Sequence, residues 1–179
     1  MRGRPFSISI DEFIKTGCFG NVKPGMMMDE VKRIFPKPDS VNCMNRKGDT
    51  YIWLYDYLEF HFFDKELMLI WCDYLGNLRS PDKKQFKLDR GFLNAPTDIT
   101  TVTRQLKRWN KQIKVIGYCP DGNLESVIYV FDSMEFFFEG DEDIPVNQWE
   151  LNGIGSLSLN FSHNYTSSFY KKLDLIDLG

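Results

Sequence analysis

Short runs of apolar and aromatic residues alternate with polar positions and are separated by turn residues, a pattern that predicts antiparallel strands. In the first half we expect a weak strand over 40–44 and clear strands over 50–55, 58–63 and 66–74. In the second half the same signals predict strands near 112–118, 125–131, 134–139 and 154–161. Tight connections such as Asp56-Tyr57 join neighbouring strands, so each half is predicted to be a meander.

Helical signals predict three short helices. The segment 10–16 follows Ser9, which forms an S-x-x-E capping box with Glu12 and would satisfy free backbone donors at the helix start. Apolar residues at helical spacing and flanking stop signals predict two further helices, over 27–35 and 99–111.

Two segments, 50–63 and 126–139, align without a gap at a spacing of 76 residues. Five of their fourteen positions are identical, whereas ordinary composition gives about one. The identical pairs are Ile52/Ile128, Asp56/Asp132, Glu59/Glu135, Phe60/Phe136 and Phe62/Phe138. This similarity predicts one hairpin that occurs twice through duplication.

We therefore expect an α+β fold made of two tandem repeats, each with short helices packed on a three- to four-stranded antiparallel meander sheet. The expected division is a first repeat over 1–75, a polar and basic connection over 76–92, a second repeat over 93–164 and a C-terminal tail over 165–179. The tail is expected to form a short helix or an edge strand.

Strict alternation along the strands sorts the side chains onto two faces of the sheet. The face expected to form the helix-covered core receives Tyr51, Trp53, Tyr55, Leu58, Phe60, Phe62, Leu67, Leu69, Trp71, Val127, Tyr129, Phe131, Met134, Phe136 and Phe138. The opposite face receives Ile52, Leu54, Glu59, His61, Phe63, Met68, Ile70, Cys72, Ile128, Val130, Glu135, Phe137 and Glu139. This second face is too apolar for a surface in water, so either the chain covers it or a partner protein docks on it.

Composition narrows the class of protein. Among the 179 residues, 42% are hydrophobic and 15% aromatic, which is ample for a core. The net charge of −3 argues against nucleic acid as a partner, and the basic residues over 83–90 and 104–114 are expected to be solvated. We expect a cytoplasmic protein with reduced thiols, because its four cysteines lack CxxC spacing and no apolar signal segment is evident. We expect no membrane span, because no apolar run approaches the ~18 residues that a span requires.

Candidate chemistry is sparse. The two histidines, His61 and His163, lie outside any ligand or triad pattern, and no phosphate-binding or nucleophile motif is present. We expect no enzyme activity, metal or cofactor, and a hydrolase using Glu59 or His61 is the least favoured alternative. The acidic run over 141–143 is expected to be a solvated loop which, if functional, would steer a basic partner.

Two segments of the chain resemble known structural modules: 22–39, which contains VKPGMMMDEV and PKPD, and the meander over 50–71, which contains IWLY and LEFHF. They resemble the helix-on-sheet modules of beta-lactamase inhibitory protein and of the small lipoprotein of the outer-membrane assembly machinery. In the inhibitor, two such modules in tandem form a concave sheet that grips a protruding loop of the target enzyme. We expect neither a signal peptide nor cysteine pairs within each repeat, and the acidic insertion is longer, so in these respects the chain departs from the inhibitor. In size, acidity and aromatic content it is also similar to the immunity proteins that accompany bacterial toxins.

The resemblance implies a non-enzymatic protein-binding inhibitor, most consistent with an immunity protein that neutralises a cognate bacterial toxin by occluding its active site. The alternative is an intracellular small-ligand or peptide-binding adaptor module whose mixed sheet face lines a pocket. The expected apolar contacts with the partner are Ile52, Leu54, His61, Phe63 and Phe137. The residues expected to pair with basic groups of the partner are Glu59, Glu135, Asp141, Glu142 and Asp143.

Overall fold

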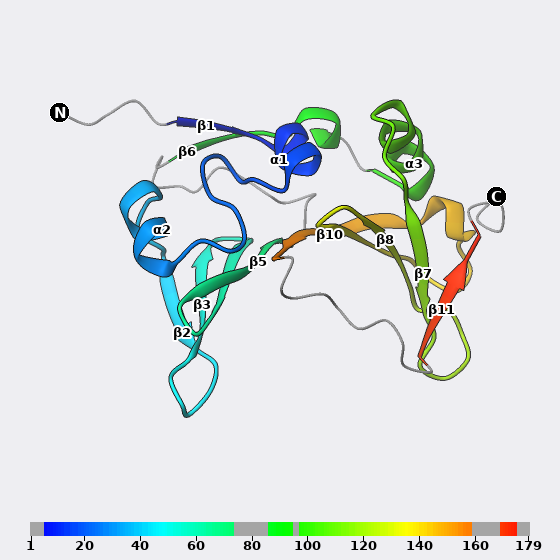
Figure 1. Cartoon of the computed structure of the whole chain (residues 1–179). Coiled ribbons are helices and arrows are strands. Elements are labelled where there is room, and N and C mark those ends of the chain that lie inside the picture. The colour runs from blue at the N-terminus through cyan, green and yellow to red at the C-terminus, as the bar shows by residue number, and fades with distance from the viewer. Residues whose placement is uncertain (1–5, 74–85, 95–96, 159–168, 175–179) are drawn as a thin grey trace.

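The computed structural model describes residues 6–73, 86–94, 97–158 and 169–174 and confirms the α+β class. Within these residues, helices lie on one side of a large antiparallel sheet, and the sheet curves away from them toward both of its ends (Figure 1). The helical elements are α1 (Ile10–Thr16), α2 (Met28–Ile34), α3 (Ile99–Arg108), η1 (Gly91–Asn94) and η2 (Val146–Gln148). The strands are β1 (Phe6–Ser9), β2 (Ser40–Cys43), β3 (Thr50–Tyr55), β4 (Leu58–Phe63), β5 (Glu66–Cys72), β6 (Phe86–Asp89), β7 (Lys114–Tyr118), β8 (Ser126–Phe131), β9 (Met134–Glu139), β10 (Glu150–Leu157) and β11 (Tyr170–Leu173).

The two halves of the chain share one sheet of nine strands, in the order β11-β7-β8-β9-β10-β5-β4-β3-β2. Each half contributes four consecutive strands as a meander, as the sequence predicts. The meanders join where β10 pairs antiparallel with β5, from Ile154 opposite Cys72 to Leu157 opposite Leu69. The halves are therefore continuous through backbone hydrogen bonds at the centre of the sheet.

The β3–β4 and β8–β9 hairpins have the same length and the same pairing. Thr50 pairs with Phe63 in the first hairpin, and Ser126 pairs with Glu139 in the second. Both turns begin with an aspartate in the left-handed region, with φ of 58° at Asp56 and 50° at Asp132. Aspartate tolerates this region better than most residues, which suits a two-residue hairpin turn. The origin of the two hairpins by duplication stays a prediction.

A β-bulge in β5 changes which side chains face the core. His61 lies opposite Leu69, but the next residue of β4, Phe62, lies opposite Leu67, so Met68 is the additional residue. Such an insertion reverses the alternation of the residues that follow it.

The alternation-based assignment of β5 is therefore wrong beyond the bulge. Ile70 and Cys72, expected on the second face, are fully buried in the core. Leu69 and Trp71, expected in the core, pair with His61 and Glu59 and lie on the opposite face of the sheet.

Helix α1 packs over the joint between the halves. Ser9 caps it by accepting a hydrogen bond from the Glu12 backbone nitrogen at 3.3 Å, as the capping motif predicts. Gly17 ends it with φ 71°, and a Cβ there would lie 2.8 Å from Ser156 Oγ, which donates to the Gly17 carbonyl at 3.0 Å. Glycine is thus required for both the conformation and the close approach to β10.

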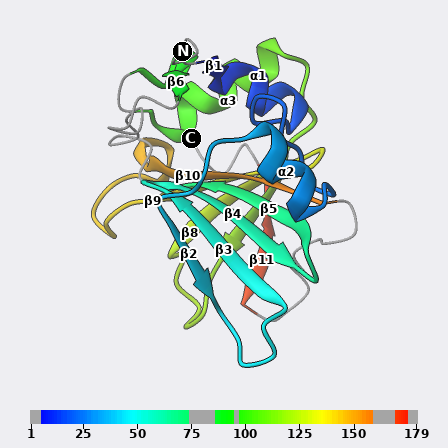
Figure 2. The ribbon, with the colours of Figure 1, turned by 90° about the vertical axis from the view of Figure 1, so that its left-hand side faces the viewer.

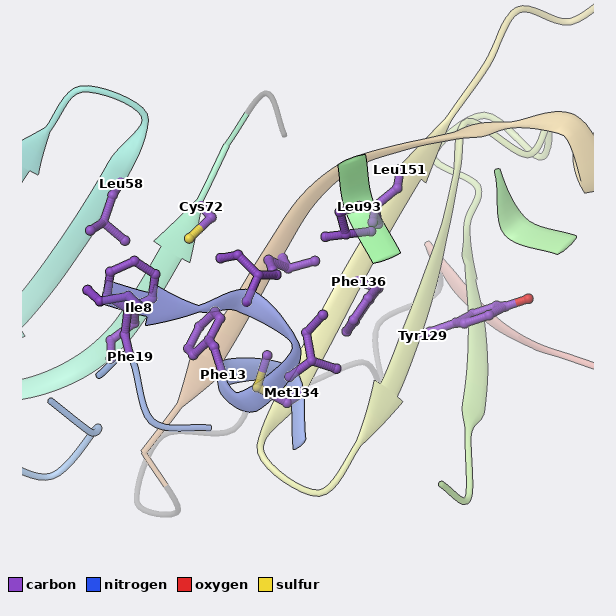
Figure 3. Close-up of a cluster of buried hydrophobic side chains, with 14 of the residues drawn as sticks. Ile8, Phe13, Phe19, Leu58, Cys72, Leu93, Tyr129, Met134, Phe136 and Leu151 are labelled. Carbon is purple, nitrogen blue, oxygen red and sulfur yellow. The ribbon is translucent and has the colours of Figure 1, made fainter. Parts of the chain in front are cut away.

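One hydrophobic core spans both halves. Phe13 of α1 lies between residues of the first meander, such as Leu58, and residues of the second, such as Met134 and Phe136 (Figure 3). All of these side chains are at most 2% exposed. The core therefore does not divide at the predicted boundary between the repeats.

The described part of the connection 76–92 is also more ordered than its composition predicts. Strand β6 pairs in parallel with β1, from Phe86 opposite Phe6 to Asp89 opposite Ser9. Phe86 is 2% exposed, and its ring centroid lies 6.1 Å from that of Phe19. This segment is therefore part of the core and not a solvated linker. In the tail, β11 pairs with β7 and forms an edge of the sheet, which is the edge-strand alternative of the sequence prediction.

Candidate functional site

The candidate site is the open face, defined as the sheet face opposite the helices, on the concave side of the curved sheet (Figure 1). The strand register places on it Ile52 and Leu54 of β3, Glu59, His61 and Phe63 of β4, Leu69 and Trp71 of β5, and Glu135 and Phe137 of β9. The structure therefore places the predicted contacts of both hairpins on one face and adds two residues that strict alternation had misassigned.

The centre of the open face is an aromatic platform formed by Trp71 and Phe137. On β10, Gly153 and Gly155 face the same side, and a Cβ on them would lie 2.3 Å and 2.8 Å from ring atoms of Trp71. The indole therefore lies across the bare backbone of β10. It meets Phe137 edge to face, with ring centroids 5.0 Å apart and an interplanar angle of 82°.

Sequence reasoning missed Trp71, although a signal for it is present. Glycine within a strand often marks the close approach of another group, and Gly153 and Gly155 are two residues apart, which puts both on one face. Two glycines on one face leave a channel that a large side chain of a neighbouring strand fills.

A polar pair lies beside the aromatic platform. Glu59 and His61 are two residues apart on β4, and Glu59 Oε2 lies 2.6 Å from His61 Nε2. Their side chains are 29% and 30% exposed, so each remains within reach of a binding partner. Glu59 lies directly opposite Trp71, and the pair therefore offers a hydrogen-bonding group next to the largest apolar surface.

Access differs strongly between the two ends of the open face. Ile52, Leu54 and Phe137 are half-buried, and Phe63 is 54% exposed. Glu135 is only 3% exposed, so a partner does not reach it in this conformation. Ile116, Ile128 and Leu157 are likewise buried on this face. The accessible part, here called the contact patch, comprises Ile52, Leu54, Glu59, His61, Phe63, Leu69, Trp71 and Phe137.

The acidic loop, Asp141, Glu142 and Asp143, is exposed as expected but belongs to a different region. It leads into η2, where Trp149 Nε1 donates to the Ile144 carbonyl at 3.1 Å. Thr100 of α3 donates to the Asn147 carbonyl at 3.0 Å, which attaches this connection to the helix side. The structure therefore does not bring the acidic loop together with the contact patch.

Other candidate chemistry is limited in the part of the chain that the structure describes. There, no group of three or more His, Cys, Asp or Glu side chains could hold a metal ion. No helix among the described segments is both long and apolar enough to cross a bilayer. Burial, with a smaller contribution from the Asp73 carboxylate, raises the pKa of the Cys72 thiol well above its ordinary value, so this thiol stays protonated in the core.

A scan against protein-family models, a search of curated proteins and a search of solved structures each found no match.

Proposed function

We propose that this chain is a protein-binding inhibitor whose contact patch covers the active site of a partner protein, in the manner of an immunity protein against a bacterial toxin. The observation that carries this proposal is the accessible aromatic platform on a sheet face that no described helix covers. An apolar surface that stays partly accessible on an uncovered sheet face is typical of a site of protein interaction.

The chemistry of the contact patch suits tight binding. Tryptophan is enriched among the few residues that dominate binding energy, and such residues lie near the centre of an interface. Trp71 is held by the backbone of β10 and by Phe137, so little side-chain freedom is left for a partner to restrict. The hydrogen-bonded Glu59 and His61 supply specificity at its border.

The charge of the chain favours a partner with a basic site. The net charge is −3, and three of the acidic residues stand together in the exposed acidic loop. Because electrostatic attraction acts before contact, the loop can steer a basic partner even though it lies outside the contact patch.

The proposal is tested by recovering the partner from lysate of the source cells with wild-type chain and two variants. Leu54→Asp places a charge in the contact patch, whereas Ile34→Asp places one at a 43% exposed apolar position on α2. We expect one protein to be recovered by the wild type and by Ile34→Asp but not by Leu54→Asp, and the added chain should suppress its activity in proportion to occupancy. Equal recovery by both variants, or no recovery by the wild type, would contradict the proposal.

Steering makes a separate kinetic prediction. Replacing Asp141, Glu142 and Asp143 by Asn, Gln and Asn should slow association with the recovered partner by roughly tenfold at low salt, with little change in dissociation. The variant should also lose most of the salt dependence of its association rate. Surface-based binding kinetics at several salt concentrations measure both. An unchanged association rate would remove the acidic loop from the mechanism.

A further inference from the structure

The two edges of the nine-stranded sheet are protected to different extents. Edge strand β11 carries Lys171 and Lys172, and exposed lysines discourage another strand from pairing with an edge. The opposite edge, β2, reads Ser-Val-Asn-Cys, with neither charge nor proline, and all four residues are exposed. Figure 2 shows the molecule from the side of this edge.

The backbone of β2 offers free pairing groups on its outer side. Beyond the strand, the Met44 nitrogen donates to the Thr50 carbonyl at 2.9 Å, so the Met44 N–H points toward β3. Because donors alternate along an antiparallel ladder, the N–H groups of Val41 and Cys43 point away from β3. Among the described strands, β3 is the one that pairs with β2.

A pocket of about 570 Å³ lies on the helix side of the sheet, between β2, β3 and α2. Its apolar lining includes Met28, Phe35, Val41 and Trp53. Phe35 is held in place by the ring of Tyr55, at a centroid distance of 5.1 Å and an angle of 84°. Phe35, one wall of the pocket, is therefore fixed by packing, and the pocket lies beside the unpaired edge, with Val41 belonging to both.

The charged residues that line this pocket are Lys32 and Lys37. Lys32 Nζ lies 3.1 Å from Asp29 Oδ1 and 6.0 Å from the Trp53 ring. Lys37 is exposed and has no ion-pair partner among the residues described. An apolar pocket bordered by lysines is complementary to an apolar group flanked by carboxylates.

We propose that an extended acidic and apolar segment of a partner protein adds to β2 as a further strand, and that one of its apolar side chains enters this pocket. Backbone hydrogen bonds to the Val41 and Cys43 N–H groups would give the segment its register. A side chain opposite Val41 would lie on the same face as Val41 and therefore on the side of the pocket. Carboxylates next to that side chain would meet Lys32 and Lys37. This site is distinct from the contact patch on the opposite face.

The test uses the full chain and a fluorescein-labelled seven-residue peptide with a central phenylalanine, valines at alternate positions and aspartates at both ends. Wild type should bind the peptide saturably, and binding should fall by at least about tenfold with Val41→Pro, because proline lacks the outward N–H. That N–H does not serve the β2–β3 ladder, so the fold should survive. Val41→Thr, which keeps the N–H and the branched shape, should bind within about threefold of the wild type.

A second arm keeps the test decisive if Val41→Pro fails to fold. Two versions of the same peptide, N-methylated on one or the other alternating set of backbone nitrogens, should differ in binding to the wild-type chain. The version whose methyl groups face β2 should lose binding because it cannot complete the ladder, and the version whose methyl groups face away should keep it. A peptide with lysines in place of aspartates should also bind weakly, and Lys37→Glu should reverse this preference. Leu54→Asp should bind the original peptide as the wild type does, which separates this site from the contact patch.

Three results would overturn the inference. The first is no binding of the acidic peptide to the wild-type chain at millimolar concentration. The second is binding of both N-methylated peptides as tightly as the original, because the pocket would then accept a side chain without strand addition. The third is a dimer in sedimentation that Val41→Pro dissociates, because a second copy of the chain would then occupy the β2 edge.

Discussion

At the scale of single residues, the absence of two side chains determines the candidate site. Gly153 and Gly155 have no Cβ, and the indole of Trp71 occupies the space where those atoms would lie. The aromatic platform therefore depends on two positions of β10 that carry no side chain.

A double-mutant cycle tests this arrangement. Gly153→Ala should reduce the free energy of unfolding by about 1–3 kcal/mol, because the added Cβ would lie 2.3 Å from Trp71 Cζ2 and force the ring or the strand to move. In a Trp71→Ala background the same substitution should cost much less, because the obstructing ring is gone. Urea unfolding of the four proteins measures the coupling. An equal cost in both backgrounds would show that Trp71 does not lie over β10.

Tyr129 makes a prediction about pH. Burial raises the pKa of Tyr129 to about 12 from its ordinary value of 10.0, and the hydrogen bond with Thr103 acts in the opposite direction. The unfolded chain releases this proton near pH 10 while the folded chain keeps it, so the stability that Tyr129 contributes should be constant well below pH 10 and fall as the pH rises through 10 toward 12. Burial also raises the pKa of Tyr55, which adds to the loss. Tyr129→Phe should make the decline in unfolding free energy between pH 9 and 11 shallower, and an unchanged slope would contradict this origin.

At the scale of elements, local signals predicted the hairpins well and the bulge not at all. The turn at Asp56 fixes the ends of β3 and β4, and both strands have the predicted bounds. The additional residue at Met68 leaves no such mark, because its apolar neighbours fit either face equally well. For this reason strict alternation assigned Trp71, the most prominent residue of the candidate site, to the wrong face.

Helix α3 provides a test of local stability. Asp98 caps it by accepting a hydrogen bond from the Thr101 nitrogen at 2.7 Å. Asp98→Ala should lower the free energy of unfolding by about 1 kcal/mol, whereas Asp98→Asn, which retains a capping oxygen, should cost less. The midpoints of chemical unfolding compare the two variants. Equal losses would mean that the side-chain oxygen at this position does not stabilise the helix.

At the scale of the whole molecule, the decisive contacts join segments that are distant in sequence. β5 pairs with β10, β1 pairs with β6, and α1 packs over both meanders. The duplicated pattern in the sequence predicts two similar meanders, but nothing in either segment specifies how they join. The single continuous open face follows from that joint.

The central claim is that the contact patch binds the partner, and hydroxyl-radical footprinting of the complex tests it most directly. Oxidation of side chains reports their access to solvent directly. Backbone hydrogen exchange would be less informative, because the amides of these strands already take part in the hydrogen bonds of the sheet. We expect binding of the recovered partner to reduce oxidation of Trp71, Phe63 and Phe137, while Met27, which is 44% exposed at the start of α2 on the helix side, is oxidised as before. Unchanged oxidation of the three aromatic residues, with protection elsewhere on the molecule, would contradict the claim.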